Sequence, residues 1–360
     1  MSQSSFLEID GSILEGGGQI LRNSMSFSAV LGIPIRITEI RKGRSKPGLA
    51  AQHLKGIQLV AKMCQGQLEG DFVGSTEIKF TPKQLTGGHF EVDIQTAGAI
   101  SLNLQVALPC ALMADKTVTL DLRGGTNADM APPIDYMKHV MRPILKKFKV
   151  DYSLEILKRG YFPRGGGHVR VMIMPVRQLH GIEMTEPGSV LQVQGYSFVT
   201  GTMPMRLAYE MAEGAKEYLK QLPNVNINCC KEQTSSRDNC SGIILTAETS
   251  SGCVMGTDAL GGRGTTAYTV GEMVAKGLED FIRVGACVDL HAQDQMIIYM
   301  ALAKGKSSVK CGYITTHTRT AIYIATLLTK VEFTIREEGE HLNIIECTGL
   351  GLVNTNLCSE

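Results

Sequence analysis

The order of apolar and polar positions alternates along the chain between helix-like and strand-like segments. In the first half, a turn rich in small residues opens an apolar helix, and a β-branched strand follows. This unit runs from Gly16 through a helix ending near Gly32 to a strand over residues 33–40, and again from Ala97 to a strand over residues 117–123. The alternation predicts helices packed on sheets, and its recurrence indicates internal duplication.

A third unit and a C-terminal segment continue the same pattern. Pro132-Pro133 suits a helix N-terminus, because proline tolerates the first turn of a helix. The loop RGYFPRGGG, with three consecutive glycines, predicts a tight turn between paired strands. The elements predicted here are helices over 134–148, 293–305 and 320–330, strands on either side of the 159–167 loop, and a hairpin over 331–347.

The pattern of apolar and polar positions over residues 185–284 differs from that of the rest of the chain and predicts a small inserted α/β domain. We expect a strand pair over 191–201, amphipathic helices over 206–222 and 271–284, a strand over 242–249 and an exposed loop over 234–242. The predicted fold class is therefore α/β (α+β type). A large domain of repeated helix–sheet units (residues 1–184 and 285–360) is interrupted by this insert, and a length of 360 residues suits two domains.

Composition narrows the class of protein. The chain is 43% hydrophobic and 20% charged with a net charge of +1, so it is globular, and any nucleic-acid contact must come from local clusters. Ten scattered cysteines without zinc-ligand spacing indicate reduced thiols in an intracellular compartment. We find no signal-peptide pattern and no run of about 18 apolar residues, so we expect a soluble protein without a membrane span.

Familiar nucleotide-binding signatures are absent. Gly305-Lys306-Ser307 resembles the end of a P-loop, but Met300 stands where the first glycine is required. The sequence also lacks the Rossmann glycine fingerprint, the protein-kinase set and the Lys-x-Asp-Gly motif of ordinary nucleic-acid ligases. If the protein uses ATP, a different residue must carry the chemistry.

His317 has the most suggestive setting among the eight histidines. It lies in Thr315-Thr316-His317-Thr318-Arg319-Thr320, directly before an apolar helix. Neutral imidazole is a good nucleophile near neutral pH, and a helix N-terminus favours phosphates. The alternative is that the threonines are ordinary helix caps and His317 is a surface residue.

A glycine turn and a basic cluster offer phosphate-binding groups. Glycines 16–18 would let the backbone approach a ligand closely, Glu15 could hold a divalent cation, and Arg22 lies on the same helix face as Gln19. The alternative is a tight turn with solvated ends. The basic cluster Arg41, Lys42, Arg44 and Lys46 is followed by Gln52-His53; arginine forks match phosphate oxygens, but such a run is often a solvated face.

Two polar positions lie within apolar helices. Gln105 interrupts an otherwise apolar helix and needs a partner, which a buried structural role would also explain. Asp294-Gln295 is predicted to open another helix, where a carboxylate complements the helix dipole.

Taken in order, these segments resemble the RNA 3′-terminal phosphate cyclase family over essentially the whole chain. The matching motifs are DGSILEGGGQILR, RKGRSKPGLAAQHL, TAGAI, GGTNADMAPPIDY, RGYFPRGGG, QDQMIIYMALA and HTRTAI. The resemblance implies a large domain of repeated units with a smaller insert. It also implies catalytic His317 and ATP contacts at Gln105, Pro132, His291, Asp294 and Gln295. Histidine stands at position 291 where relatives have a tyrosine that stacks on adenine. Further implied are phosphate or RNA contacts at Arg22, Arg41, Arg44 and Gln52, and a Mg²⁺ or Mn²⁺ ligand at Glu15.

The chemistry implied by the resemblance has three steps. A histidine–AMP intermediate forms from ATP, AMP passes to an RNA 3′-phosphate, and the neighbouring 2′-hydroxyl closes a 2′,3′-cyclic phosphate. The expected location is the nucleus, with the cytosol as an alternative. Two rivals are a non-catalytic cyclase-like branch that acts in ribosome biogenesis and lacks the histidine, and enolpyruvyl transferases, which have similar repeated units but need neither the histidine nor ATP.

Overall fold

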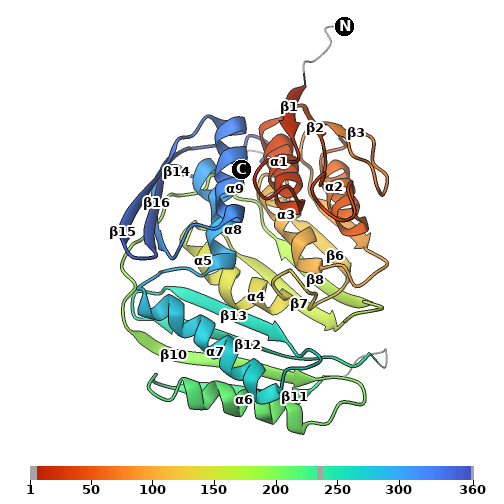
Figure 1. Ribbon diagram of the computed structural model, residues 1–360. Coiled ribbons are helices and arrows are strands. Elements are labelled where there is room, and N and C mark those ends of the chain that lie inside the picture. Colours follow the sequence, from red (N-terminus) through yellow and green to blue (C-terminus); the bar gives the residue numbers. More distant parts are fainter. Residues whose placement is uncertain (1–5, 233–237, 358–360) are drawn as a thin grey trace, which may run out of the picture.

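The fold consists of four four-stranded mixed sheets with helices packed on them (Figure 1). The structure is a computed structural model that describes residues 6–232 and 238–357. The predicted fold class is confirmed, and three of the sheets belong to units with the same order of elements. Each unit runs strand, helix, strand, helix, strand, strand.

The first unit spans residues 7–81. It consists of β1 (Leu7–Asp10), α1 (Gly18–Leu31), β2 (Ile35–Thr38), α2 (Ala51–Met63), β3 (Gln67–Glu69) and β4 (Ile78–Thr81). The sheet order is β1-β2-β4-β3, in which β1 and β2 are parallel and the other pairs are antiparallel. Gly32 ends α1 with a left-handed backbone (φ 69°), a conformation that glycine adopts without a steric cost.

The second unit repeats this topology. It consists of β5 (Gly88–Asp93), α3 (Ile100–Leu112), β6 (Val118–Gly124), the continuous helical segments α4 (Ile134–Tyr136), η1 (Met137–Met141) and α5 (Arg142–Lys147), then β7 (Tyr152–Lys158) and β8 (Gly167–Ile173). The order β5-β6-β8-β7 matches the first unit strand for strand. The loop RGYFPRGGG joins two antiparallel strands, as predicted.

The third unit is split by the insert. Its elements are β9 (Glu183–Met184), α8 (Leu290–Leu302), β14 (Lys304–Cys311), α9 (Thr316–Thr329), β15 (Phe333–Gly339) and β16 (Leu342–Leu350). The order β15-β16-β14-β9 is the same arrangement again, with β9 parallel to β14. Three copies of one unit account for the duplication that the sequence indicated.

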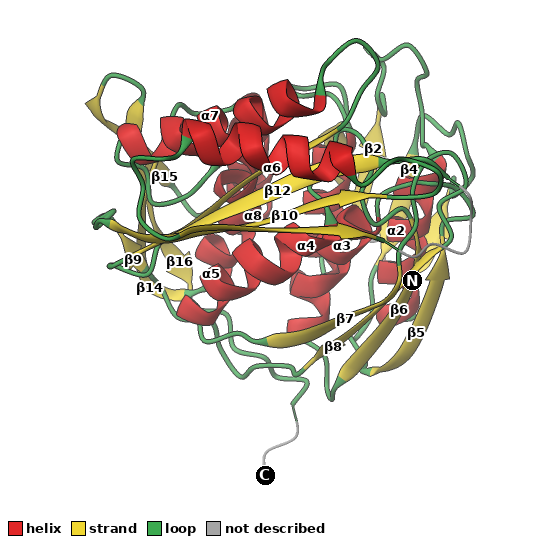
Figure 2. Ribbon diagram, turned by 90° about the horizontal axis from the view of Figure 1, so that it is seen from below, coloured by secondary structure: helices red, strands yellow, loops and turns green. Residues whose placement is uncertain are grey.

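Between β9 and α8 the chain forms a separate layer. It contains β10 (Val190–Val199), α6 (Arg206–Tyr218), β11 (Val225–Lys231), β12 (Ser241–Thr249), β13 (Val254–Leu260) and α7 (Ala267–Arg283). Helices α6 and α7 cover one face of the sheet around their own hydrophobic cluster (Figure 2). The other face is turned toward α4 and η1. The exact boundaries of the predicted insert stay a prediction.

Helices α1, α3, α8 and α9 lie together in the middle of the large domain, with the sheets around them (Figure 1). Their apolar faces and the inner faces of the three sheets share one hydrophobic cluster. Among the described helices, none has the length and apolar content needed to cross a membrane. The cysteines that the structure describes are all free thiols.

Several sequence predictions were wrong in detail. Helix α8 begins at Leu290 with Asp289 as its cap, so Asp294 lies in the second turn and does not open the helix. Residues 191–201 are not a strand pair, because β10 is one strand hydrogen-bonded to β11 on one side and β12 on the other. Of the predicted 234–242 loop, residues 234–237 lie outside the described residues, while Ser241 and Gly242 begin β12. The helix predicted over 293–305 ends at Leu302, and Gly305-Lys306-Ser307 lies in strand β14.

Candidate active site

The glycine turn after β1 folds Glu15 back over the start of α1. A side chain at Gly17 would stand 2.0 Å from the Glu15 carboxylate, so a larger residue there would displace the carboxylate from this position. The Glu15 amide donates to Thr320 Oγ1 (3.2 Å) on α9, and Arg44 binds the Glu15 carboxylate. Glu15 Oε2 is buried without a hydrogen-bond partner among the described residues. The turn therefore places a partly unsatisfied carboxylate beside the first turn of α9.

Arg22 and His53 lie against the N-terminus of α1. A side chain at Gly18 would stand 2.6 Å from His53 Nε2 and 2.9 Å from Arg22 Nη1. Arg22 Nη2 donates to Gln19 Oε1, which fixes the guanidinium along the helix. Burial, together with the nearby positive charges of Arg22 and Arg41, lowers the pKa of His53 to about 3. His53 is therefore neutral at physiological pH.

The neutral state of His53 predicts a pH-dependent stability. His53 Nδ1 accepts from the Ala50 amide (3.4 Å) and so must stay unprotonated there. Because its pKa is about 3 when folded and 6.5 in the reference state, the unfolded chain binds the extra proton between these values. Stability then falls as pH decreases through this window, by up to about 1.4 kcal/mol per pH unit. Urea unfolding from pH 7 to 4 should show this slope in the native protein and a shallower one in His53→Gln. Parallel curves would contradict the assignment.

His317 is an exposed residue in the first turn of α9. Thr315 caps the helix by accepting from the Thr318 amide (3.0 Å). Thr315 therefore has the predicted capping role, and the imidazole of His317 lies at the surface beside it.

Gln293 on α8 holds this capped turn in place. Its Oε1 accepts from the Thr315 amide (3.2 Å) and from the Thr318 hydroxyl, and its Nε2 donates to the Tyr313 carbonyl (3.2 Å). The side chain is buried, so these bonds satisfy an amide that would otherwise be costly to bury. Gln293 therefore fixes the start of α9 relative to α8.

Asp294 is the acidic centre of the site. Burial raises the pKa of its carboxyl, while the positive charge of Arg22 lowers it, as would His317 and His291 in their protonated forms. Burial likewise lowers the pKa of Arg22, and Asp294 and Glu15 oppose that effect. These mutual effects on the pKa values indicate that the four side chains lie close enough to interact electrostatically as one cluster. They come from the glycine turn (Glu15), α1 (Arg22), α8 (Asp294) and α9 (His317).

His291 lies at the edge of this cluster, next to Tyr136. The two rings meet edge to face with centroids 5.5 Å apart, and His291 is exposed on its other side. Asp289 caps α8 by accepting from the amides of His291 and Ala292 (both 2.9 Å). The same buried carboxylate accepts from the Tyr136 hydroxyl (2.6 Å) and from the Gly256 amide (2.7 Å) on β13. Asp289 thus joins the insert, the α4 segment and the start of α8.

The other predicted ATP contacts lie on neighbouring helices. Gln105 and Gln295 line one small cavity together with Arg22. Gln295 Nε2 donates to the His291 carbonyl (2.6 Å), and its Oε1 is buried without a partner among the described residues. Pro132 is buried before α4, and its carbonyl accepts from Ser101 Oγ (2.6 Å), one turn before Gln105 on α3. Two of these residues thus share a cavity with Arg22.

The remaining predicted phosphate contacts surround the first two units. Arg41 Nη1 donates to the Gly48 carbonyl (2.9 Å), which stabilises the basic loop, and Arg44 reaches Glu15. Gln52 lies at the start of α2, where its Oε1 accepts from the Ala99 amide (3.2 Å). Gln52, His53 and Arg22 line a second small cavity. The structure therefore brings Glu15, Arg22, Arg44, Asp294 and His317 together, with Arg41 and Gln52 at one border of the cluster.

Sequence reasoning missed Gln293, Asp289 and Tyr136. Gln293 and Tyr136 lie within recognised motifs, but no periodicity indicates that their side chains cross between helices. Asp289 precedes an apolar helix, which is the ordinary position of a cap, and that signal was available. Its bonds to Tyr136 and Gly256 join residues far apart in the chain.

A second group of potential metal ligands lies elsewhere, on the outer face of the β5-β6-β8-β7 sheet. His89, Glu91 and Asp121 have ligand atoms near one another. Burial raises the pKa of Asp121, but hydrogen bonds from Arg170, His89 and His168 more than offset this and lower the pKa below its usual range. The Arg170 guanidinium already binds both carboxylate oxygens (3.1 and 3.0 Å) and would repel a cation. This group forms an ion-pair network.

Comparison with known proteins identifies the family of the chain. A family model described as RNA 3′-terminal phosphate cyclase matches residues 13–335. The chain is 38% identical over 358 residues to the Drosophila melanogaster protein named RNA 3′-terminal phosphate cyclase, covering 98% of this chain and 99% of that one. It is 38% identical over 345 residues to a Pyrobaculum aerophilum protein of the same name, with 96% and 99% coverage. A Methanopyrus kandleri protein of that name matches at 38% over 342 residues, with 93% and 97% coverage. The chain therefore belongs to the RNA 3′-terminal phosphate cyclase family.

Proposed function

We propose that this protein uses ATP and His317 to convert the 3′-phosphate of an RNA into a 2′,3′-cyclic phosphate. The observation that carries the proposal is the position of His317. Its exposed imidazole stands at a helix N-terminus, within the electrostatic reach of Asp294, on the helix whose Thr320 binds the Glu15 turn. An imidazole in this setting is accessible to a phosphorus atom and is surrounded by groups that bind phosphate.

Two helix N-termini and several cations supply the polyphosphate site. Gly17 precedes α1 without a side-chain cap, so the first amides of α1 are available to an anion. Helix α9 begins beside the same turn, and its first-turn dipole also favours negative charge. Arg22 and Arg44 add positive charge, which stabilises the negative charge that develops on the leaving pyrophosphate.

The residues present fit a divalent cation at Glu15. Its Oε2 is a buried carboxylate oxygen without a hydrogen-bond partner among the described residues, and such an oxygen is a ligand that Mg²⁺ or Mn²⁺ prefers. One protein carboxylate with phosphate oxygens completing the coordination is common for Mg²⁺. When bound, the cation neutralises charge on the phosphates. Arg44, which binds the other carboxylate oxygen, keeps Glu15 oriented.

The proposed reaction has three balanced steps. An imidazole nitrogen of His317 attacks the α-phosphorus of ATP, forming a P–N bond while the bond to the β-phosphate oxygen breaks and pyrophosphate leaves. An oxygen of the RNA 3′-phosphate then attacks the same phosphorus, the P–N bond breaks, and an RNA–AMP anhydride forms. Finally the 2′-oxygen attacks the 3′-phosphorus, loses its proton and releases AMP.

The last step needs little from the protein. The 2′-oxygen and the activated phosphorus belong to one ribose, so the attack is intramolecular and benefits from a high effective molarity. The protein must hold the terminal nucleotide and stabilise the departing AMP. Because the attacking group is a 2′-hydroxyl, we expect DNA 3′-phosphates to be activated but not cyclised.

A direct experiment tests the proposal. The purified protein is incubated with Mg²⁺ and ATP labelled at the α-phosphate, and the bound label is mapped by peptide mass spectrometry. We expect AMP on His317, and conversion of an RNA 3′-phosphate to a phosphatase-resistant end. Absence of covalent AMP would overturn the proposal and favour a non-catalytic member of the family.

Glu15→Gln should reduce adenylylation at limiting Mg²⁺ by at least about tenfold, because the variant keeps the side chain's size but loses the negative charge that attracts the cation. The measurement is the initial rate of label incorporation across a Mg²⁺ titration, in which the half-saturating concentration should rise. Glu39→Gln is the matched control, since Glu39 pairs with Lys42 at the surface. An unchanged Mg²⁺ dependence in Glu15→Gln would exclude Glu15 as a ligand.

A further inference from the structure

The loop RGYFPRGGG between β7 and β8 has no role in the steps above. We propose that its tip, formed by Phe162 and Arg164, binds the RNA strand upstream of the 3′-phosphate, with Phe162 stacking on a base and Arg164 contacting the backbone. This inference rests on the proposed function for the identity of the strand, and it adds a second RNA contact outside the adenylylation site.

The base of the loop is held by close backbone packing. The Thr126 amide donates to the Gly160 carbonyl and the Gly125 amide to the Gly98 carbonyl (both 2.8 Å). A side chain at Gly160 would stand 2.6 Å from the Gly124 carbonyl oxygen, and one at Gly165 would stand 2.4 Å from that of Thr96. Glycine is therefore required where the three loops 94–99, 124–131 and 159–167 meet. The tip projects from a fixed base.

The side chains at the tip of the loop are exposed to solvent and so do not stabilise the fold by packing. Phe162 is 76% exposed, and Met130 on the adjoining loop is 98% exposed, the largest values among the described large hydrophobic residues. Phe162 and Met130 lie on two loops whose bases are hydrogen-bonded to each other. The Arg164 side chain is 72% exposed and lies 3.8 Å from Asp238, a weak contact. An exposed aromatic ring and an exposed guanidinium two residues apart are the combination that binds single-stranded nucleic acid.

Further cations lie beside the loop where the strands end. Arg123 on β6 and Lys158 on β7 are both register partners of His168 on β8, so the three residues stand in a row on one face of the sheet. Arg123 and Lys158 have no carboxylate partner among the described residues. Asp93 continues the row on β5, and His168 is bound to Asp121 (2.7 Å). The two unpaired cations extend the positive charge of Arg164 along the edge of the domain.

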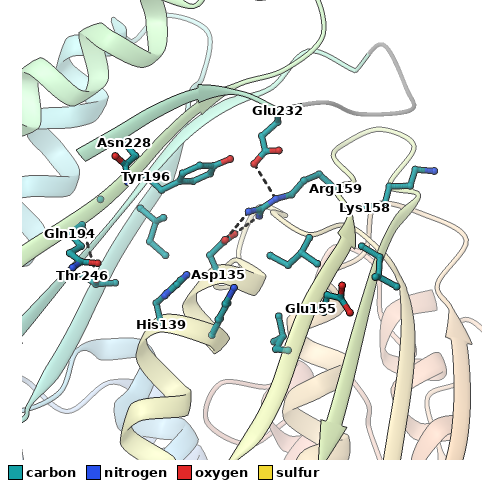
Figure 3. A pocket seen from close by; sticks show the side chains of 16 residues that line it. Asp135, His139, Glu155, Lys158, Arg159, Gln194, Tyr196, Asn228, Glu232 and Thr246 are labelled. Carbon is teal, nitrogen blue, oxygen red and sulfur yellow. Dashed lines mark hydrogen bonds and ion pairs between the residues drawn. The ribbon is translucent and has the colours of Figure 1, made fainter. Parts of the chain in front are cut away.

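The large cleft beneath the loop is a poorer place for RNA. It has a volume of about 650 Å³ between β7, the α4 segment and the sheet of the insert (Figure 3). Its carboxylates, Asp135, Glu155 and Glu232, oppose phosphates. Arg159 is already bound to two of them and lies over the Tyr196 ring (5.5 Å). The basic side chains that line the cleft, Lys138, Lys158 and Arg159, equal these carboxylates in number, so the cleft has no excess of positive charge. Arg159 anchors the base of the loop to the insert through Glu232.

The loop is connected to the candidate active site through backbone contacts. Gly165 packs on Thr96 and Ala97, and two residues further the Ala99 amide binds Gln52, a predicted phosphate contact beside His53 and Arg22. An RNA strand whose 3′-phosphate lies beside Gln52 can therefore pass over the place where the loops 94–99 and 159–167 meet and reach Phe162 and Arg164.

Substrates of different length test the proposal. For a single-stranded RNA of about 12 nucleotides ending in a 3′-phosphate, Phe162→Ala/Arg164→Ala should raise KM about tenfold and leave kcat unchanged. The KM for a dinucleotide 3′-phosphate and the rate of adenylylation without RNA should not change. The salt dependence of binding of the long RNA, measured by fluorescence anisotropy without ATP, should become shallower by about one phosphate contact in Arg164→Ala.

The controls separate this proposal from the proposed function. Met273→Ala and Arg206→Ala remove an exposed apolar residue and an exposed arginine from the insert's helices, and neither should affect the long RNA. A long-RNA KM within twofold of the native value, or an equal rise for the dinucleotide, would overturn the role of the loop. Failure of the native protein to form covalent AMP would overturn the proposed function instead, and the anisotropy measurement would still decide whether the loop binds RNA.

Discussion

Replacing His317 with alanine is expected to abolish covalent attachment of AMP, lowering the rate of labelling by at least about 10³-fold, the size of loss typical for removal of a nucleophile. The reason is local. His317 is exposed in the first turn of α9, the helix that binds the Glu15 turn, and it interacts electrostatically with Asp294. His291 is also exposed and interacts with Asp294 from the first turn of α8, but its ring packs against Tyr136. The fold should be unaffected, because the ring is exposed and Thr315 and Gln293 hold the helix start.

Two controls make the His317 experiment decisive. His341→Ala removes another exposed histidine, on the turn between β15 and β16, and should label normally. His317→Asn keeps a polar side chain of similar reach without a nucleophilic nitrogen and should be as inactive as the alanine variant. Label that persists in both His317 variants would show that another residue carries AMP.

Asp289→Ala should cause the largest loss of stability, about 3–5 kcal/mol in the free energy of unfolding. The buried carboxylate accepts four hydrogen bonds, from the amides of His291, Ala292 and Gly256 and from the Tyr136 hydroxyl. Removal leaves these donors buried without an acceptor and deprives α8 of its cap. Urea denaturation measures the loss, and ATP binding should weaken as well because His291 follows the cap.

Asp280→Ala provides the comparison for Asp289. Asp280 also accepts a hydrogen bond, from Arg283, but it is at the surface of the insert, where an ion pair contributes about 0–1 kcal/mol. Similar losses in the two variants would mean that Asp289 is not the joint between the insert and the large domain that its four bonds indicate.

Local features of the site were predictable from the sequence. The turn before α1, the caps at Thr315 and the basic loop all depend on residues close in the chain, and local chemistry determines them. The association of Glu15, Arg22, Asp294 and His317 was predicted only through resemblance to a family, because these residues come from the first and third units and meet through tertiary packing. The side-chain bonds of Gln293, and those of Asp289 to Tyr136 and Gly256, have no sequence signal.

The third copy of the repeated unit could not be predicted from the sequence, for a related reason. Strand β9 has two residues, too few to produce a hydrophobic pattern, and the whole insert separates it from α8. Its pairing with β14 is therefore invisible to periodicity. The start of α8 was misplaced because Asp294 looks like a cap, whereas the true cap is Asp289, which also makes bonds outside the helix.

The split of the third unit bears on how the protein is made. Strand β16, near the C-terminus, is an interior strand between β15 and β14. Strand β9 cannot pair until β14 has been synthesised. During translation the first two units can assemble while His317 is still unsynthesised, and the sheet that supports α9 is incomplete until the ribosome has released the residues up to about 350. A chain that lacks β14, β15 and β16 would present Arg22, Arg41 and Arg44 without the sheet that supports α9, so we expect the proposed nucleophile His317 to be positioned only after these strands have been made.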